Sequence, residues 1–492
     1  MQTNKRILSI LLTLALAAGL LAIAPITASA VGTNVAIAQA DSVSTIQANI
    51  QNAIDGIATG ETVTVTGSKT DADIQLYLEI PEGKTVKWEA DYAGSVYMDT
   101  LVFCNWLGLM EIAGGSIINE CDTPHPNPDL GVCNHTFIGG HILVSDGKVR
   151  AAYGVAIYAN RSVTVRGGEV SAADGTAIHT IGPGNKIEIS GGTVSTADGI
   201  AIHANEVSDI VVSGGTVSAN NGNAISSNGG EITISGGTVS AGSSPINVSN
   251  CNVKVSGGEV KATGFGHAIS TGSDDGNIGI EVSGGTVSSA SGCALYTFPR
   301  GDIVVSGGMV SSGSTTGGVI LANGNVTVSD GVVKSAGPSA ITTGMSGKIA
   351  VSGGVVSSAL GTAISAHADI TISGGLVFGR GKQLRGPSSG VIVNTGGTTS
   401  KTGSAVVVEW KADAAKNYSQ GTTTHLDMKS SNSATWHNNG TASGIKYGTD
   451  GFFAVDGVTV HPYKVIFGTR YEANLLNWIL FFIGFGFIWM WF

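Results

Sequence analysis

The middle of the chain is built from short runs in which apolar and polar residues alternate. In Ile232-Thr-Ile-Ser235 both isoleucines fall on one face of a strand, and in Thr238-Val239-Ser240 the valine returns to that face. A Gly-Gly pair separates the two runs. It predicts a corner where a side chain would clash or where φ must be positive. A polar turn then leads to a third strand, of which Gly175-Thr-Ala-Ile-His179 is an example.

This three-strand unit recurs along most of the chain. The second glycine of its pair stands at Gly115, Gly147, Gly168, Gly192, Gly215, Gly237, Gly258, Gly285, Gly308, Gly331, Gly354 and Gly375. From Gly147 onward the copies lie 21 to 27 residues apart, and no segment there has the 3.6-residue period of a helix. Three strands and three corners in about 23 residues are the geometry of one β-solenoid coil. About twelve coils at a strand spacing of ~4.8 Å predict a rod roughly 58 Å long around one core of Ile and Val.

A helical segment precedes the repeats. Residues 42–57 carry apolar side chains at helical spacing, namely Val43, Ile46, Ile50, Ile54 and Ile57. The end coil of a solenoid lacks a neighbour on one side and needs a cap. We therefore expect residues 31–100 to form a cap helix and the first strands, and residues 101–386 to form the parallel β-helix repeats.

The cap helix leads into Gly60-Glu-Thr-Val-Thr-Val-Thr66 and then Ile80-Pro-Glu-Gly-Lys-Thr-Val-Lys87. This series resembles the entry of secreted right-handed parallel β-helices of the pectate-lyase-like superfamily. The Ser-Gly-Gly-Thr-Val repeats are similar to bacterial surface proteins of that superfamily described as carbohydrate-binding. The resemblance covers roughly residues 42–386. It implies an all-β, right-handed parallel β-helix and is specific for fold rather than for activity, because a fold does not fix a function.

The first 30 residues have the layout of a secretory signal peptide. Lys5 and Arg6 form a short basic region, an apolar run spans residues 7–26, and Ala28-Ser29-Ala30 is a small-x-small cleavage site. We expect residues 1–30 to be removed on export. An uncleaved anchor helix is the alternative.

Two further segments follow the repeats. Residues 387–470 contain more aromatic residues, and the runs Ala405-Val-Val-Val-Glu-Trp410 and 453–460 have the composition of strands. They predict a β-rich C-terminal cap or accessory domain. Residues 475–492 carry no charge and reach ~27 Å as a helix, which predicts a hydrophobic membrane anchor. A buried hydrophobic tail and an oligomer contact are the alternatives for this last segment.

Composition agrees with this layout and limits the partners. The chain has 73 glycines in 492 residues and only 12% charged residues, as repeated tight corners around a continuous core require. Removal of Lys5 and Arg6 with the signal peptide changes the net charge from −10 to −12. An acidic chain without basic clusters does not suit nucleic acid, and an anionic polysaccharide would need bridging cations.

Five cysteines are few for an exported chain of this length. Cys121 and Cys133 bracket a loop rich in Pro and Asp, and we expect a disulfide between them to close it. His125, His135 and Cys104 near this loop leave a metal site as the alternative, although their spacing matches no common zinc pattern.

Stacked coils place like positions in columns on the surface. The position after Ala-Ile is Tyr158, His179 and His203 in three successive coils, and the turn before it holds Asp174 and Asp198 in two of them. A tyrosine ring can stack on a sugar while histidine and aspartate hydrogen-bond to hydroxyl groups. These five residues are the candidate ligand-binding site.

Two other interpretations stay open for the same residues. Asp-Gly is a common turn pair, so the aspartates and histidines can simply lie on a solvated face. Alternatively, stacked aspartates bind Ca²⁺ and a basic side chain abstracts a proton from a uronate, as in the pectate lyases that the chain resembles. Ca²⁺ takes six to eight oxygen ligands, and two aspartates supply too few. We assign no catalytic residue and no metal ligand, and we expect no cofactor, with Ca²⁺ as the alternative.

These observations predict an exported, extracellular protein at the cell surface, anchored to the membrane at its C-terminus. The resemblance implies that its rod binds an extracellular polysaccharide or glycan, and we expect binding without turnover. A structural or adhesive surface stalk is the first alternative. A Ca²⁺-dependent polysaccharide lyase is the second.

Overall fold

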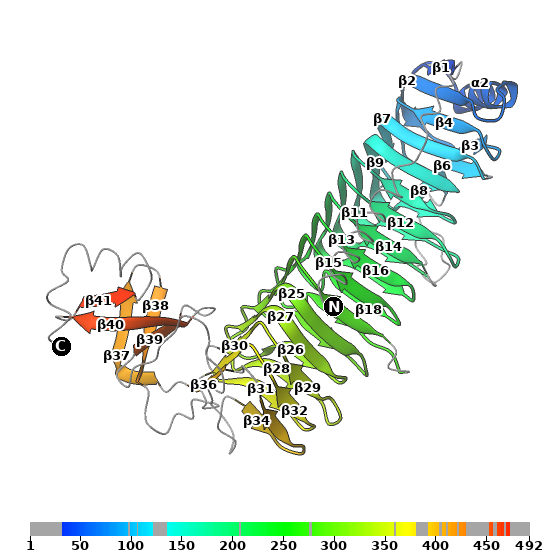
Figure 1. Ribbon diagram of the computed structural model, residues 1–492. Coiled ribbons are helices and arrows are strands. Elements are labelled where there is room, and N and C mark those ends of the chain that lie inside the picture. Colours follow the sequence, from blue (N-terminus) through cyan, green and yellow to red (C-terminus); the bar gives the residue numbers. More distant parts are fainter. Residues whose placement is uncertain are drawn as a thin grey trace, which may run out of the picture.

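The computed structural model describes most of the chain between residues 32 and 472. Residues 32–379 and 392–402 are described, apart from gaps at 97–98, 106, 122–134, 206–207, 275–277 and 359–360. Of Phe378 and Lys401 only the backbone is described. From residue 406 onward the description is limited to the backbone of individual strands. Figure 1 shows a long stack of strands with one helix across its N-terminal end. The chain is all-β, and its parallel β-solenoid has about 13 turns over residues 62–377.

The first part of the chain forms the N-terminal end of the rod. Its elements are β1 (Thr33–Ile37), α2 (Val43–Gly56), β2 (Thr62–Ala72), β3 (Leu76–Glu79), β4 (Thr85–Trp88), β5 (Asp91–Gly94), β6 (Thr100–Asn105), β7 (Leu109–Asn119), β8 (His135–Gly139) and β9 (His141–Ala159).

The central coils follow, and they are the most regular. Their strands are β10 (Val163–Val165), β11 (Glu169–Thr180), β12 (Lys186–Ile189), β13 (Thr193–Ala204), β14 (Asp209–Val212), β15 (Thr216–Asn228), β16 (Glu231–Ile234), β17 (Thr238–Ala241), β18 (Ile246–Ser249), β19 (Asn252–Val255) and β20 (Glu259–Ala262).

The C-terminal coils complete the same 36-stranded sheet. Their strands are β21 (Ile269–Thr271), β22 (Gly279–Val282), β23 (Thr286–Ser289), β24 (Leu295–Thr297), β25 (Asp302–Ser312), β26 (Gly318–Ala322), β27 (Val326–Ser335), β28 (Ser339–Thr343), β29 (Ile349–Val351), β30 (Val355–Ser358), β31 (Thr362–Ala366), β32 (Ile370–Ile372), β33 (Leu376–Gly379), β34 (Ile392–Asn394), β35 (Thr399–Lys401) and β36 (Val406–Glu409).

Successive coils pair in parallel and in the register that the repeat predicts. Strand β12 pairs with β14, and β13 pairs with β15. Val194 therefore faces Val217, and Ile202 faces Ile225. These side chains have no exposed surface and belong to one continuous core along the rod. Burial of one such side chain contributes about 1.5–3 kcal/mol, so the stacked valines and isoleucines are the main favourable term.

The second glycine of each predicted corner adopts a positive φ, and this holds at all twelve positions. At Gly192 φ is +69°, and a Cβ would lie 2.6 Å from the backbone carbon of Gly167 in the preceding coil. Both reasons for a glycine at this corner, the left-handed backbone and the lack of space, are therefore confirmed.

The cap helix is confirmed as α2, and it covers the open end of the first coils. Ser42 is the N-cap, and its Oγ accepts a hydrogen bond of 3.1 Å from the Thr45 amide. Ile46, Ile50 and Ile54 are fully buried against the core of the rod.

Polar side chains also link α2 to the edge of β3. The amide of Tyr77 donates to Gln47 Oε1 at 3.2 Å, and that of Glu79 donates to Gln51 Oε1 at 2.9 Å. Gln51 Nε2 in turn donates to the Glu79 carbonyl at 3.1 Å. The helix thus supplies the hydrogen bonds that a further strand would have made.

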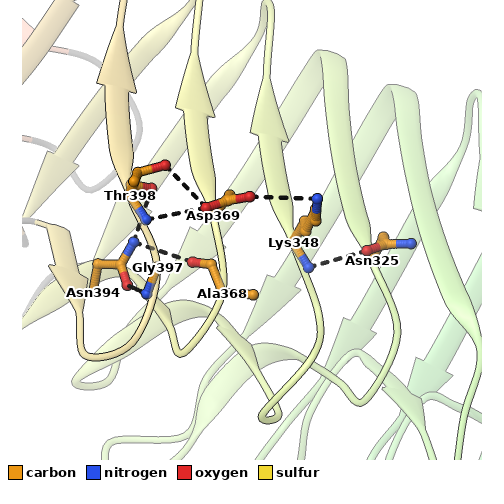
Figure 2. Close-up of polar contacts among 7 residues, drawn as sticks. All are labelled: Asn325, Lys348, Ala368, Asp369, Asn394, Gly397 and Thr398. Atoms are coloured by element: carbon orange, nitrogen blue, oxygen red, sulfur yellow. Dashed lines mark hydrogen bonds and ion pairs between the residues drawn. The ribbon is translucent and has the colours of Figure 1, made fainter.

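Near the other end, side chains at the start of successive strands tie one coil to the next (Figure 2). Asn325 Oδ1 accepts a 3.0 Å hydrogen bond from the Lys348 amide, and Lys348 Nζ lies 3.3 Å from Asp369 Oδ2. Asp369 Oδ1 accepts from the backbone and the hydroxyl of Thr398 at 3.1 and 2.9 Å. The Thr398 hydrogen bonds and Lys348 lower the pKa of Asp369.

The parallel pairing continues beyond the last glycine corner. Strands β34, β35 and β36 pair with β31, β32 and β33, so the boundary expected at residue 386 falls inside the stack. The expected strand around residues 405–410 is β36 and belongs to the rod.

A separate five-stranded antiparallel sheet follows in the sequence. Its strands are β37 (Ala412–Gln420), β38 (Thr423–Lys429), β39 (Phe452–Val455), β40 (Val460–Ile466) and β41 (Thr469–Glu472). The run 453–460, expected as one strand, is divided between β39 and β40, which pair as a hairpin.

Both chain ends that carry targeting predictions, residues 1–30 and 475–492, lie outside the described residues. Within the described part of the chain, no helix is long and apolar enough to span a membrane.

Candidate functional site

The predicted surface column is present in the structure. Tyr158 on β9 faces His179 on β11, which faces His203 on β13. The column continues through Ser226, Asn247, Ser270 and Tyr296. Strand alternation explains its orientation, because Ile157, Ile178 and Ile202, one residue earlier, are fully buried in the core.

The rings of the column touch from coil to coil. The Tyr158 and His179 centroids are 5.1 Å apart with an interplanar angle of 82°, and those of His179 and His203 are 4.7 Å apart at 29°. His135 on β8 adds a fourth ring, 4.7 Å from Tyr158. These distances are close to the ~4.8 Å spacing of neighbouring strands. We call these four residues the first ring cluster.

Asn205 joins the two stacked histidines. His203 Nε2 donates to Asn205 Oδ1 at 2.7 Å, and Asn205 Nδ2 donates to His179 Nε2 at 3.1 Å. Because the amide oxygen only accepts and the amide nitrogen only donates, His203 carries its proton on Nε2 and His179 accepts on Nε2. Asn205 was not among the predicted site residues, although its place two residues after His203 puts it on the same face of the chain.

The environment of the cluster keeps His179 uncharged. Burial lowers the pKa of His179 to about 4, and the nearby His203 and His135 contribute to the same shift. At neutral pH the ring is therefore a neutral aromatic group with one hydrogen-bond donor and one acceptor.

Asp174 and Asp198 form a different column. They face each other on β11 and β13, and each is exposed. Asp198 Oδ1 accepts a 2.8 Å hydrogen bond from Asn221 Nδ2 in the next coil. Gly175 and Gly199, both with positive φ, separate these carboxylates from the histidines further along the same strands. The register that the sequence predicted for the two aspartates is confirmed, and their role in ligand binding stays a prediction.

The metal and disulfide predictions concern the loop after β7. Cys121 is buried, and its predicted partner Cys133 and His125 lie outside the described residues, so the disulfide stays a prediction. Cys104 points into the core, and burial raises the pKa of its thiol. Among the described side chains, no group of three or more His, Cys, Asp or Glu is placed to hold a metal ion.

Comparisons of this chain with protein-family models, with curated proteins and with solved structures find no match.

Proposed function

We propose that this chain is an exported, membrane-anchored surface protein whose β-solenoid rod binds an extracellular glycan without turnover. Its relation to the pectate-lyase-like superfamily is part of the same proposal and rests on the sequence motifs. The observation that carries the binding proposal is the first ring cluster, a row of partly exposed rings joined by Asn205.

The chemistry of the cluster suits a sugar. A pyranose ring has apolar C–H faces, which stack on aromatic rings, and an edge of hydroxyl groups, which need donors and acceptors. Tyr158 and the two histidines offer both properties. Their rings are held by contacts between coils, so little side-chain freedom is lost on binding.

Charge indicates which glycans fit. The chain carries a net charge of −10 before any processing, which repels anionic polymers. The neutral His179 ring adds no positive charge that would offset this repulsion. A neutral glycan is therefore the proposed ligand, with Asp174 and Asp198 available for further hydroxyl contacts.

A glycan array and a polysaccharide pull-down with the full-length protein, with and without Ca²⁺, test this function. We expect retention on a neutral polymer that stays intact. Tyr158→Ala and His203→Ala should each weaken binding about two- to tenfold, which corresponds to the loss of one ring contact. Thr164→Ala, on the outward face of β10, is the matched control and should bind as the wild type does.

Other outcomes would select the alternatives. Absence of retention on every polymer would favour a structural or adhesive stalk. A Ca²⁺-dependent rise in the absorbance of unsaturated uronate would favour a lyase that uses Asp174 and Asp198.

A further inference from the structure

A second group of rings lies further along the same column. His267 and Tyr296 stack with centroids 4.4 Å apart and an interplanar angle of 16°. Tyr296 and Phe298 are 6.4 Å apart at 10°, so the three rings are nearly parallel. We call His267, Tyr296 and Phe298 the second ring cluster. Tyr296 lies on β24, which pairs with β21 and β26, and Phe298 is the residue after that strand.

Both ring clusters contain a His–Tyr pair in the same strand register, although the rings meet edge-to-face at 66° in the first cluster and stack at 16° in the second. His135 faces Val155 in the next coil, and Tyr158 stands three residues after Val155. Ile269 likewise faces Leu295, and this register sets His267 opposite Cys293, three residues before Tyr296. A histidine of one coil thus contacts a tyrosine of the next coil at both places. The arrangement recurs at two separate coils of one face, so it is not a feature of a single turn.

His267 is held in one hydrogen-bonding state. The Cys293 amide donates to His267 Nδ1 at 3.1 Å, so Nδ1 is unprotonated. Burial lowers the pKa of His267, which favours the neutral ring with its proton on Nε2. The second ring cluster therefore offers an aromatic surface together with a fixed N–H donor.

Large aromatic side chains at this site remain in solvent. Phe298 keeps 60% of its surface exposed, and Phe265, two residues before His267, keeps 93%. Exposed rings beside hydrogen-bonding groups mark interaction surfaces. The rings suit a ligand with a flat apolar face and a polar edge.

The column between the clusters is short and polar. Ser226, Asn247 and Ser270 occupy it in three successive coils, so hydroxyl and amide groups connect the two sets of rings. Tyr296 lies six coils from Tyr158, which corresponds to about 29 Å at ~4.8 Å per coil. An extended β-1,4-linked glucose chain advances per sugar by a distance similar to the coil spacing, is neutral, and has apolar faces.

We propose that the second ring cluster is a second glycan site and that one neutral, extended β-1,4-linked chain lies along the rod axis across both clusters. This inference rests on the proposed function and deepens it. Sugars stack on the rings at each end, and the hydroxyl and amide groups of the intervening column contact the sugars between them.

Calorimetric titration of the full-length protein with cellotriose and with hydroxyethyl cellulose tests the proposal. Cellotriose is too short to span both clusters, and hydroxyethyl cellulose is a soluble neutral polymer that can. We expect two cellotriose sites per chain and one in the Tyr296→Ala/Phe298→Ala variant. The wild type should bind the polymer at least about tenfold more tightly than cellotriose, because the second contact becomes intramolecular.

The variant should lose this polymer advantage while its remaining cellotriose site keeps the wild-type affinity. Met345→Ala removes another exposed apolar side chain, 90% exposed, and should behave as the wild type. One cellotriose site in the wild type, with no change on the Tyr296→Ala/Phe298→Ala substitution, would overturn the second site and leave the proposed function intact. Failure of the wild type to bind either probe would overturn this inference. The proposed function would fail only if the glycan array also showed no retention.

Discussion

At the scale of single residues, the corner glycines meet two requirements at once. At Gly215 φ is +69°, and a Cβ would lie 2.7 Å from the backbone carbon of Gly191. The left-handed conformation costs an L-residue about 1–2 kcal/mol. The neighbouring atom belongs to the backbone, which cannot rotate away, so any side chain there would push two coils apart.

Gly215→Ala should therefore destabilise the rod. We expect the free energy of unfolding to fall by about 2–4 kcal/mol from strain and steric overlap, seen as a lower midpoint in thermal unfolding followed by circular dichroism. Gly56→Ala is the control, because a Cβ there would have no neighbour within 4 Å. It should leave stability unchanged or raise it by up to about 1 kcal/mol. Equal midpoints for the two variants would contradict this explanation of the corner.

His179 gives a pH dependence of stability. Its pKa of about 4 in the folded chain lies below the ordinary value of 6.5, so the unfolded chain binds the proton more readily. The contribution of His179 to the free energy of unfolding is fully present above pH 6.5 and decreases as the pH is lowered from 6.5 towards 4. Below pH 4 this group causes no further loss. The neighbouring His203 and His135 of the same cluster contribute to the lowered pKa of His179. The unfolding midpoint of His179→Gln should decline less over this range, and parallel curves for variant and wild type would refute the assignment.

At the scale of elements, α2 protects an edge as well as a core. Strand β3 pairs with β6 on one side, and on the other side its amides donate to Gln47 and Gln51. Unpaired strand edges invite association with other chains. A helix that presents glutamine side chains to such an edge satisfies its hydrogen bonds without offering another strand.

Gln51→Ala should weaken this cap. The Glu79 amide and carbonyl each lose a partner, and we expect the first coils to lose about 1–3 kcal/mol. Faster amide exchange at Glu79 in native-state hydrogen exchange would report the loss locally. Asn52→Ala, at an exposed position of the same helix, should change stability by less than about 0.5 kcal/mol. Unchanged exchange at Glu79 would show that the glutamine does not protect the edge.

The coil pattern could be predicted from the sequence because glycine corners and alternating strands are local signals. Their spacing was sufficient to align Tyr158, His179 and His203 and to place Asp174 beside Asp198. Contacts that depend on the lateral offset between coils were missed. To predict the contact of Asn205 with the two histidines, or that of His135 with Tyr158, one must know how side chains extend across neighbouring strands.

The end of the rod was harder to predict for a different physical reason. No Gly-Gly pair stands between β35 and β36 in the sequence, although β34 to β36 continue the parallel pairing. Side-chain hydrogen bonds such as those of Asp369 and Asn394 also connect these coils. They leave no repeated motif in the sequence.

At the scale of the whole molecule, each coil of the rod contacts its neighbours in the stack. Stability is then close to a sum of coil terms and interface terms. The two ring clusters belong to different coils and share no described contact, so their binding contributions should be nearly independent for short ligands. Coupling between them requires a ligand long enough to reach both.

Because equivalent residues pair in successive coils, the number of coils sets the distance between two sites on the rod. Val217 pairs with Val194 in the same register in which Val239 pairs with Val217. Duplication of one coil in the gene would therefore insert a unit that can pair with both of its neighbours. Each insertion between Asn205 and His267 would move the two ring clusters apart by ~4.8 Å without altering either one. Reach along a polymer can thus evolve separately from the chemistry of each contact.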